Sequence, residues 1–226
     1  MISVLTLTYK RHHLLEEAIE SFLRQPFLSI CEMVIINDNL DVDYIYEHPK
    51  IKIINHKKRF LSISDKIEWG YKQCKYNYIY RLDDDDLLAP LAINNVKIDI
   101  ESNPGYEIYR SKGMHFFLDN IYSGEAGSVN NGNVYTKAYL DRIVFPGSSC
   151  DEDSHITFGN NANIYTSKLE HTMCYRWGMG TLHISGMGQQ PNEAILAQAD
   201  KVLNNTKGVI ELHPHFDNDY YEQLPK

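Results

Sequence analysis

The sequence predicts an α/β fold in which a mostly parallel central sheet is flanked by helices. Short apolar runs rich in β-branched residues recur along the first half of the chain, and segments with helical periodicity lie between them. Polar residues follow directly where three of the apolar runs end. In sheets of this kind ligands bind outside the carboxyl ends of the strands, so the polar ends are expected to form one site.

The first hundred residues alternate between strand and helix signals. Residues 2–8 are apolar and β-branched, which predicts a buried strand. Residues 11–24 carry an apolar stripe at helical spacing, which predicts a helix. Pro90 would lie in the first turn of a later helix, where its missing N–H costs little. The same criteria predict strands at 33–37, 51–54 and 76–82, and helices at 62–75 and from about 88 to 101.

The second half of the chain has weaker signals. Gly159-Asn160-Asn161 interrupts one of its expected helices, and residues 176–186 are rich in glycine and aromatic residues. We see no linker long enough to mark a second domain, so we expect one domain over 1–226, with divisions near 100 and 190. The expected elements are strands at 106–111 and 114–118, a loop at 128–135, and helices at 136–143, 155–169 and 192–204.

The composition of the chain argues against several classes of function. The 226 residues carry 22 basic and 30 acidic side chains, a net charge of −8, whereas free-standing nucleic-acid binders usually have a basic surplus. The four cysteines form no CxxC pair, so a zinc ribbon is not expected. No stretch approaches the roughly 20 apolar residues of a transmembrane segment, and no signal peptide is evident, so we expect a cytoplasmic protein.

Four consecutive aspartates, Asp83 to Asp86, directly follow an apolar strand. Adjacent carboxylates repel one another, and a cation or solvent must relieve the repulsion. Mg²⁺ and Mn²⁺ prefer oxygen ligands, and Mg²⁺ is typically held by one or two carboxylates together with substrate phosphates. The run is therefore a candidate seat for a metal–diphosphate complex, although an arbitrary acidic run would more often be a solvated turn.

At this point the chain resembles the inverting glycosyltransferases of family 2, which have the GT-A fold. The resemblance rests on ISVLTLTYKR (2–11), VIINDN (34–39), YIYRLDDDDLLAP (78–90) and DED (151–153), and it covers about residues 1–185. It implies hexosyl or pentosyl transfer from a nucleotide diphosphate sugar, with Mn²⁺ or Mg²⁺ and inversion at the anomeric carbon. The first hundred residues would bind the nucleotide sugar, and residues 101–190 would form the acceptor side.

The resemblance implies a set of donor-binding residues. The family's first motif corresponds to Leu7-Thr8-Tyr9-Lys10-Arg11, where its proline and asparagine are replaced, and its second motif keeps Asp38 for the base. The family's Asp-x-Asp falls on Asp83 and Asp85 as metal ligands, but four aspartates in a row leave Asp84 and Asp86 open. The implied donor-binding residues are Thr8, Tyr9, Arg11, Asp38, Lys66, Asp83 and Asp84, with Arg59 as a weaker candidate.

The catalytic base is implied by a Glu-Asp pair downstream. Asp153 is the expected base and Glu152 the next choice, because an inverting transfer needs one carboxylate to take the acceptor proton. Taken without the upstream motifs, these acids would be ordinary residues of a helix start. His183 is the implied histidine ligand of the metal, with His213 and His215 as rivals. Asn133, Arg176 and Trp177 are the candidates for the acceptor side.

Several alternatives stay open from sequence. A UDP-sugar is the first expectation for the donor because uridine is the family's commonest base. The acceptor could be a glycan of a bacterial or phage surface, another glycoconjugate, or a hydroxymethylated base in phage DNA, which the net charge disfavours. A catalytically inactive nucleotide-sugar-binding domain is the non-enzymatic alternative. A P-loop NTPase is excluded because no GxxxxGK[ST] occurs.

Overall fold

The structure is a computed structural model, and it describes residues 1–26, 28–149, 151–178 and 206–225. Its helices are α1 (His12–Leu23), a 3₁₀ turn (Leu28–Ile30), α2 (Ile63–Tyr71), α3 (Ala92–Ser102), α4 (Lys137–Arg142) and α5 (Glu152–Phe158). Its first strands are β1 (Ile2–Thr8), β2 (Cys31–Asn37), β3 (Val42–Ile45), β4 (Ile51–Asn55), β5 (Tyr78–Asp83) and β6 (Leu87–Leu88). The later strands are β7 (Ile108–Arg110), β8 (Gly113–Leu118), β9 (Ile121–Gly127), β10 (Val134–Thr136), β11 (Ile164–Thr166), β12 (Met173–Trp177) and β13 (Gly208–Glu211).

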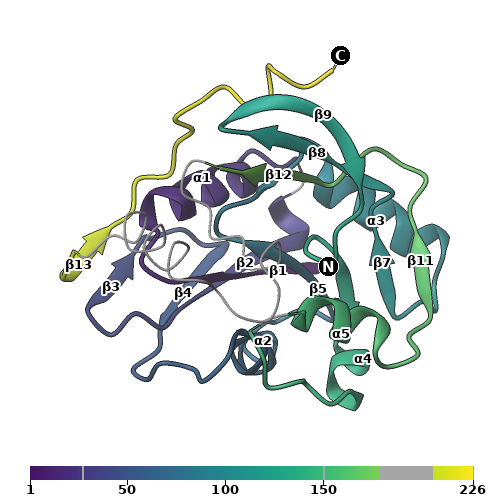
Figure 1. The fold of residues 1–226 in the computed structure, drawn as a ribbon, viewed down its shortest axis with the longest axis horizontal. Coiled ribbons are helices and arrows are strands. Elements are labelled where there is room, and N and C mark those ends of the chain that lie inside the picture. The colour runs from purple at the N-terminus through teal and green to yellow at the C-terminus, as the bar shows by residue number, and fades with distance from the viewer. Residues whose placement is uncertain (27, 150, 179–205, 226) are drawn as a thin grey trace.

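A seven-stranded sheet forms the centre of the described chain, in the order β11-β7-β10-β5-β1-β2-β4 (Figure 1). Strands β5, β1, β2 and β4 run parallel, and β10 is antiparallel to both of its neighbours. The expectation of a mostly parallel central sheet is therefore confirmed. A smaller sheet, β6-β12-β8-β9, packs beside it, and β13 pairs with β3.

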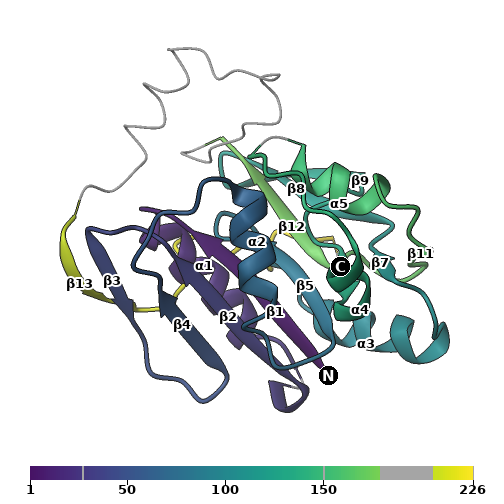
Figure 2. The same ribbon diagram turned by 90° about the horizontal axis from the view of Figure 1, so that it is seen from below.

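Helices cover both faces of the central sheet. One apolar cluster joins α1 and α3 to residues of β1, β2 and β5 such as Val4, Ile35 and Leu82. A second cluster joins α2, α4 and α5 to the alternate residues, such as Leu5 and Ile36. This alternation is the period of two that a strand buried on both faces requires. In Figures 1 and 2 the two sets of helices lie on opposite sides of the sheet.

The carboxyl ends of β1, β2 and β5 meet at one edge of the sheet, because Thr8 pairs with Asn37 and Leu7 pairs with Asp83. The polar segments that follow these strands therefore come together as predicted. Each expected element of the first hundred residues is present, with differences in detail. Leu87 and Leu88 form β6, and the helix expected from about 88 begins at Ala92, so Pro90 precedes the helix instead of lying in its first turn. The 3₁₀ turn and β3 were not predicted.

The second half departs further from expectation. The helix expected over 155–169 ends at Phe158, and residues 164–166 form β11. Asn161 lies between them in the left-handed region with φ +52°, which a continuing helix does not allow. β9 was not predicted, because its alternating exposed and half-buried pattern IYSGEAG contains two glycines. The loop expected over 128–135 ends earlier than predicted, since β10 begins at Val134. The helix expected over 192–204 and most of the segment 176–186 lie outside the described residues. No helix of the described residues is long and apolar enough to cross a membrane.

Candidate active site

The acidic run begins at the last residue of β5. Oxygen atoms of Asp83, Asp85 and Asp86 lie within 4.8 Å of one another, which makes these three side chains a candidate metal centre. Asp85 and Asp86 are buried, and Asp83 is half-buried. Carboxylate oxygens are the ligands that Mg²⁺ and Mn²⁺ prefer, so the donor set fits a divalent cation of this class.

Asp84 does not belong to this cluster. Its carboxylate is fully buried and forms an ion pair with Arg11, which also donates to Asp85 Oδ2 at 2.9 Å. Burial raises the pKa of Asp84 to about 6, against the lowering effect of Arg11. The expectation that Asp84 contacts the donor is not supported by this position, because the carboxylate is fully buried and paired with Arg11.

Asp86 is the third carboxylate of this cluster, whereas the sequence left both Asp84 and Asp86 open as members. Its two oxygens accept from the backbone N–H of Arg176 at 2.9 Å and from Asn131 Nδ2 at 2.6 Å. Burial and the neighbouring Asp85 raise the pKa of Asp86 well above its usual value. Burial therefore favours the neutral form of Asp86, although the N–H of Arg176 partly opposes this shift.

Glu152 and Asp153 are the first two residues of α5 and line the same cavity as the metal cluster. The start of a helix favours negative charge there. Burial nevertheless raises the pKa of Glu152 to about 7 and that of Asp153 to about 6. Arg81, on β5, opposes this shift at Asp153 and forms a 2.5 Å ion pair with Asp83. Arg81 therefore stands between the candidate base and the candidate metal centre.

The cavity that these groups share has a volume of about 440 Å³. Neutral polar side chains of its lining come from the loop before β10, from the segment before α5 and from α5 itself. They belong to Ser128, Asn130, Asn131, Ser149 and Ser154, and Tyr175 of β12 also lines the cavity.

A second cavity, of about 220 Å³, adjoins the first and shares Arg11, Arg81 and Asp83 with it. It contains Asp38, which is fully buried and accepts from Lys66 Nζ at 2.6 Å and from the Phe60 N–H at 3.1 Å.

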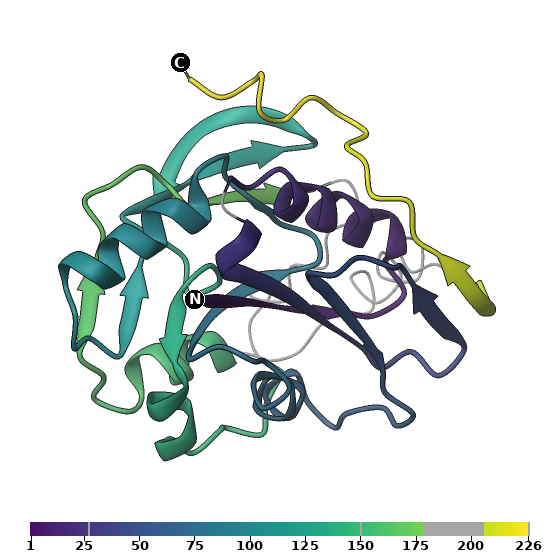
Figure 3. The ribbon, with the colours of Figure 1, turned by 180° about the vertical axis from the view of Figure 1, so that it is seen from behind.

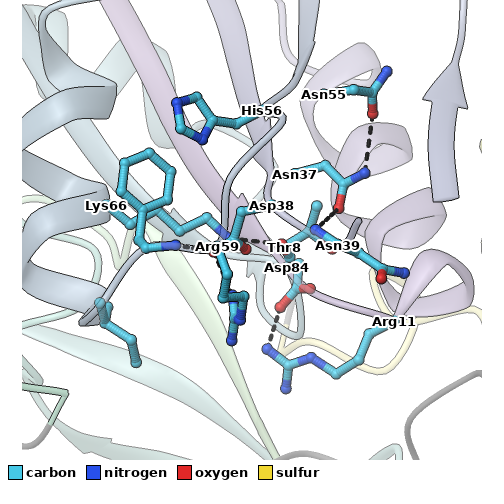
Figure 4. Close-up of polar contacts among 12 residues, drawn as sticks. Thr8, Arg11, Asn37, Asp38, Asn39, Asn55, His56, Arg59, Lys66 and Asp84 are labelled. Atoms are coloured by element: carbon cyan, nitrogen blue, oxygen red, sulfur yellow. Dashed lines mark hydrogen bonds and ion pairs between the residues drawn. The ribbon is translucent and has the colours of Figure 1, made fainter. Parts of the chain in front are cut away.

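Figure 4 shows Lys66 and Arg59 converging on Asp38, while Arg11 reaches Asp84. Burial opposes the ionisation of Asp38, but Lys66, the Phe60 N–H and Arg59 outweigh it, so the pKa of Asp38 is lowered. Burial disfavours the charged form of Lys66 as well, and it lowers the pKa of Lys66 to about 8.

The donor-side expectations meet in this second cavity. Thr8, Tyr9, Arg11, Asp38 and Lys66 all line it, and so does Arg59. The Arg59 guanidinium lies 3.6 Å from the centre of the Tyr9 ring, which places a cation over an aromatic face at the cavity wall. Lys66 is only 5% exposed and also donates to the Thr8 carbonyl at 2.7 Å, so it supports Asp38 and the end of β1.

The acceptor-side expectations are not supported by the positions of the residues. Asn133 is 1% exposed and donates to Thr157, so its neighbours Asn130 and Asn131 line the cavity instead. Arg176 is also 1% exposed and contacts the acidic run from behind. Trp177 is exposed and does not line the cavity, whereas Tyr175, two residues earlier on the same face of β12, does.

Of the histidine candidates, His183 lies outside the described residues. His213 and His215 are on the C-terminal tail and do not line the acidic cavity. Both ring nitrogens of His215 have partners, one at the His213 carbonyl and one at Asp217.

Sequence reasoning missed Arg81 and Tyr175. Arg81 had a detectable signal, because a charged residue inside the otherwise apolar strand 76–82 needs a buried partner. Tyr175 had none, since its role depends on how β12 packs beside β6.

Residues 3–106 match the family model described as Glycosyl transferase family 2. No curated protein sequence matches the chain. Several solved structures share its fold at low sequence identity. Crystal structures of S. aureus TarS 1–349 in complex with UDP and with UDP-GlcNAc both have a TM-score of 0.62 and 15% identity. They cover 78% and 80% of this chain and 60% and 59% of theirs.

The mannosyltransferase PcManGT from Pyrobaculum calidifontis, in complex with GDP-Man and Mn²⁺, has a TM-score of 0.56 and 14% identity. It covers 77% of this chain and 56% of its own. This chain thus spans about three fifths of the length of these structures. The shared fold is GT-A, with a mostly parallel central sheet.

Proposed function

We propose that this chain, whose residues 3–106 belong to glycosyl transferase family 2 and whose fold is GT-A, transfers a sugar from a nucleotide diphosphate sugar to an acceptor hydroxyl. One observation carries the proposal. The acidic cluster and the Glu152–Asp153 pair line one cavity, and the Asp38 pocket opens beside it. A metal–diphosphate seat, a base and a nucleotide pocket are thus adjacent.

The second cavity is the proposed nucleotide site, and a UDP-sugar is the proposed donor. Asp38 is held ionised by Lys66 and Arg59, so it can accept a hydrogen bond from a base N–H. Tyr9 offers an aromatic face beside it. The TarS structures that share the fold contain UDP or UDP-GlcNAc, and PcManGT contains GDP-Man, which supports a nucleotide sugar in general.

A divalent cation, Mn²⁺ or Mg²⁺, is the proposed cofactor. The walls of the larger cavity carry six acidic side chains, of Asp83, Asp85, Asp86, Asp151, Glu152 and Asp153, against the two arginines Arg11 and Arg81. Such walls repel a diphosphate unless positive charge is added. Asp83, Asp85 and Asp86 would hold the cation, which would supply Lewis-acid stabilisation to the departing diphosphate.

Asp153 is the proposed base, and the transfer is proposed to invert the anomeric carbon. The acceptor oxygen bonds to that carbon as the bond to the diphosphate oxygen breaks, and the acceptor proton passes to the Asp153 carboxylate. A single displacement inverts the configuration and needs no carboxylate nucleophile. Arg81 favours the ionised form of Asp153 and so keeps it able to take the proton.

The proposed acceptor is a glycan or a comparable polyhydroxyl compound. The neutral wall of Ser128, Asn130, Ser149 and Ser154 offers hydrogen bonds suited to hydroxyl groups. Both arginines of the cavity are already paired with aspartates, so among the described residues this cavity offers little to a phosphate backbone. This favours glycoconjugate synthesis over a hydroxymethylated DNA base.

The first experiment is a thermal-shift screen of nucleotide diphosphates and their sugars, each with and without Mn²⁺. We expect a Mn²⁺-dependent rise in the melting temperature with uridine compounds, because ligands of the native state stabilise it by mass action. In Asp85→Ala the Mn²⁺-dependent part should disappear. Asp43→Asn is the matched control, since Asp43 pairs with Lys57 on the surface.

Two results would count against the proposal. A flat response of the folded protein to every nucleotide would contradict the donor class. Binding of a nucleotide sugar without transfer to any hydroxyl acceptor or to water would favour an inactive binding domain.

A further inference from the structure

Arg176, on β12, contacts the acidic run through its backbone and its side chain. Its N–H donates to Asp86 Oδ1 at 2.9 Å, and its Nε donates to the Asp85 carbonyl at 2.6 Å. It is 1% exposed, and β12 pairs with β6, which directly follows the run. Arg176 therefore fixes both the backbone of Asp85 and the carboxylate of Asp86 from the side opposite the cavity.

Two further buried groups hold the guanidinium of Arg176. Glu17, on α1, forms an ion pair with Nη1, and the Tyr220 hydroxyl accepts from the same nitrogen at 3.0 Å. Glu17 is 3% exposed and Tyr220 is fully buried. A buried arginine is costly without such partners, so their loss would allow the side chain to turn toward another acceptor.

Tyr220 belongs to a C-terminal tail, residues 212–224, that crosses the outside of the molecule. In Figure 3 this tail passes α1 and ends beside β9. The Asp217 N–H donates to Glu17 Oε1 at 3.1 Å, and the Tyr221 hydroxyl donates to the Leu88 carbonyl at 2.6 Å. The Tyr220 ring packs edge-on against Phe117 and Phe216. The tail is thus anchored to α1, to β6, which directly follows the acidic run, and to β8.

We propose that the C-terminal tail positions the metal-binding aspartates, acting through Tyr220 and Arg176. Arg176 is a positioning residue, because it touches Asp85 and Asp86 and not the reacting atoms. The chain of contacts runs from the Tyr220 hydroxyl to Arg176 and from there to the run, although Tyr220 is more than 130 residues away in sequence. The link to metal binding rests on the proposed function, whereas the positioning of the run does not.

The test is Tyr220→Phe, which removes the hydroxyl and keeps the ring that packs on Phe117. The matched control is Tyr109→Phe, because Tyr109 is also buried and its hydroxyl donates to the Asn103 carbonyl at 2.9 Å, away from the run. Hydrogen exchange is measured on the peptide covering residues 83–88, and Mn²⁺ affinity is measured by the loss of the free-ion signal in electron paramagnetic resonance.

In Tyr220→Phe we expect exchange in the 83–88 peptide to be about tenfold faster and the Mn²⁺ dissociation constant to be about tenfold larger, which is the effect of losing one hydrogen bond to a charged group. Tyr109→Phe should change neither. Arg176→Lys, which keeps the charge but lacks Nε, should reproduce both effects.

The outcomes separate this proposal from the proposed function. Unchanged exchange and unchanged Mn²⁺ affinity in both Tyr220→Phe and Arg176→Lys would overturn the positioning role. Equal effects in Tyr220→Phe and Tyr109→Phe would also overturn it, since they would reflect general loosening. If exchange rises in Tyr220→Phe and the unmodified protein binds no Mn²⁺, the positioning role stands and the proposed metal dependence fails.

Discussion

The four consecutive aspartates differ in their partners. Asp83 pairs with Arg81, Asp84 and Asp85 share Arg11, and Asp86 accepts from Asn131 and the N–H of Arg176. Asp83, Asp85 and Asp86 line the larger cavity, whereas Asp84 is fully buried and does not. The three that line the cavity are the ones that can share a cation.

Replacing Asp153 by Asn tests the assignment of the base. We expect donor binding to persist, since Asp153 does not line the nucleotide cavity, and transfer to fall by about 10²–10⁴-fold, the usual contribution of general base catalysis. Single-turnover transfer from the bound donor measures this. Asp43→Asn serves as the control, and near-normal transfer by Asp153→Asn would assign the proton to another group.

The pH dependence of transfer follows from the raised pKa values of Glu152 and Asp153. A base acts only when deprotonated, and burial raises these pKa values to about 7 and about 6. Transfer at saturating donor should therefore increase as pH rises from about 5 and level off above about 7. A rate that is flat from pH 5 to 8 would show that neither carboxyl group takes the proton in the rate-limiting step.

At the scale of elements, the hairpin of β8 and β9 depends on a glycine at its start. Gly113 pairs with Gly127 across the hairpin. A Cβ at Gly113 would lie 2.6 Å from the Ala126 carbonyl oxygen and 2.8 Å from Cε1 of His171, whereas one at Gly127 would meet nothing within 4 Å. The buried His171 ring therefore packs so close to Gly113 that no residue with a Cβ fits at that position without a shift.

We expect Gly113→Ala to lower the free energy of unfolding by about 1–3 kcal/mol, because overpacking against backbone forces a shift. Gly127→Ala, at the paired position, should change it by less than about 0.5 kcal/mol. Chemical denaturation of both variants measures the difference. Equal stability of the two variants would mean that the hairpin accommodates a Cβ at Gly113 without losing stability.

At the scale of the whole molecule, the two cavities are not independent. Arg11, Arg81 and Asp83 belong to the walls of both, so charge added at one cavity alters the other. Neither cavity lies within one element, because the walls come from the ends of β1 and β5 and from the segments before α2 and α5.

Binding of Mn²⁺ and of UDP should therefore be coupled. Isothermal titration should show that saturating Mn²⁺ tightens UDP binding by about 5–150-fold, and that UDP tightens Mn²⁺ binding by the same factor, as linkage requires. In Asp83→Ala the coupling should be lost. Identical UDP affinities with and without Mn²⁺ would contradict a shared site.

Local sequence patterns are enough to predict the parallel sheet and the meeting of the polar segments after β1, β2 and β5. They are enough because the apolar period sets which segments are strands, and parallel strands bring their carboxyl ends to one edge. The same pattern placed Asp38 and the acidic run near one another, whereas Lys66 was implied by the family resemblance. Local patterns could not determine the helix-to-strand change after Phe158, which depends on the backbone at Asn161.

Which residues face the site depends on tertiary packing. Asn133 and Arg176 were expected at the acceptor side, yet both are buried behind it, and Arg176 is turned toward Glu17 and Tyr220. The direction of a side chain on a short strand depends on the strand that pairs beside it and on partners far away in sequence. Such partners contribute through burial and charge pairing, which no local pattern of residues records.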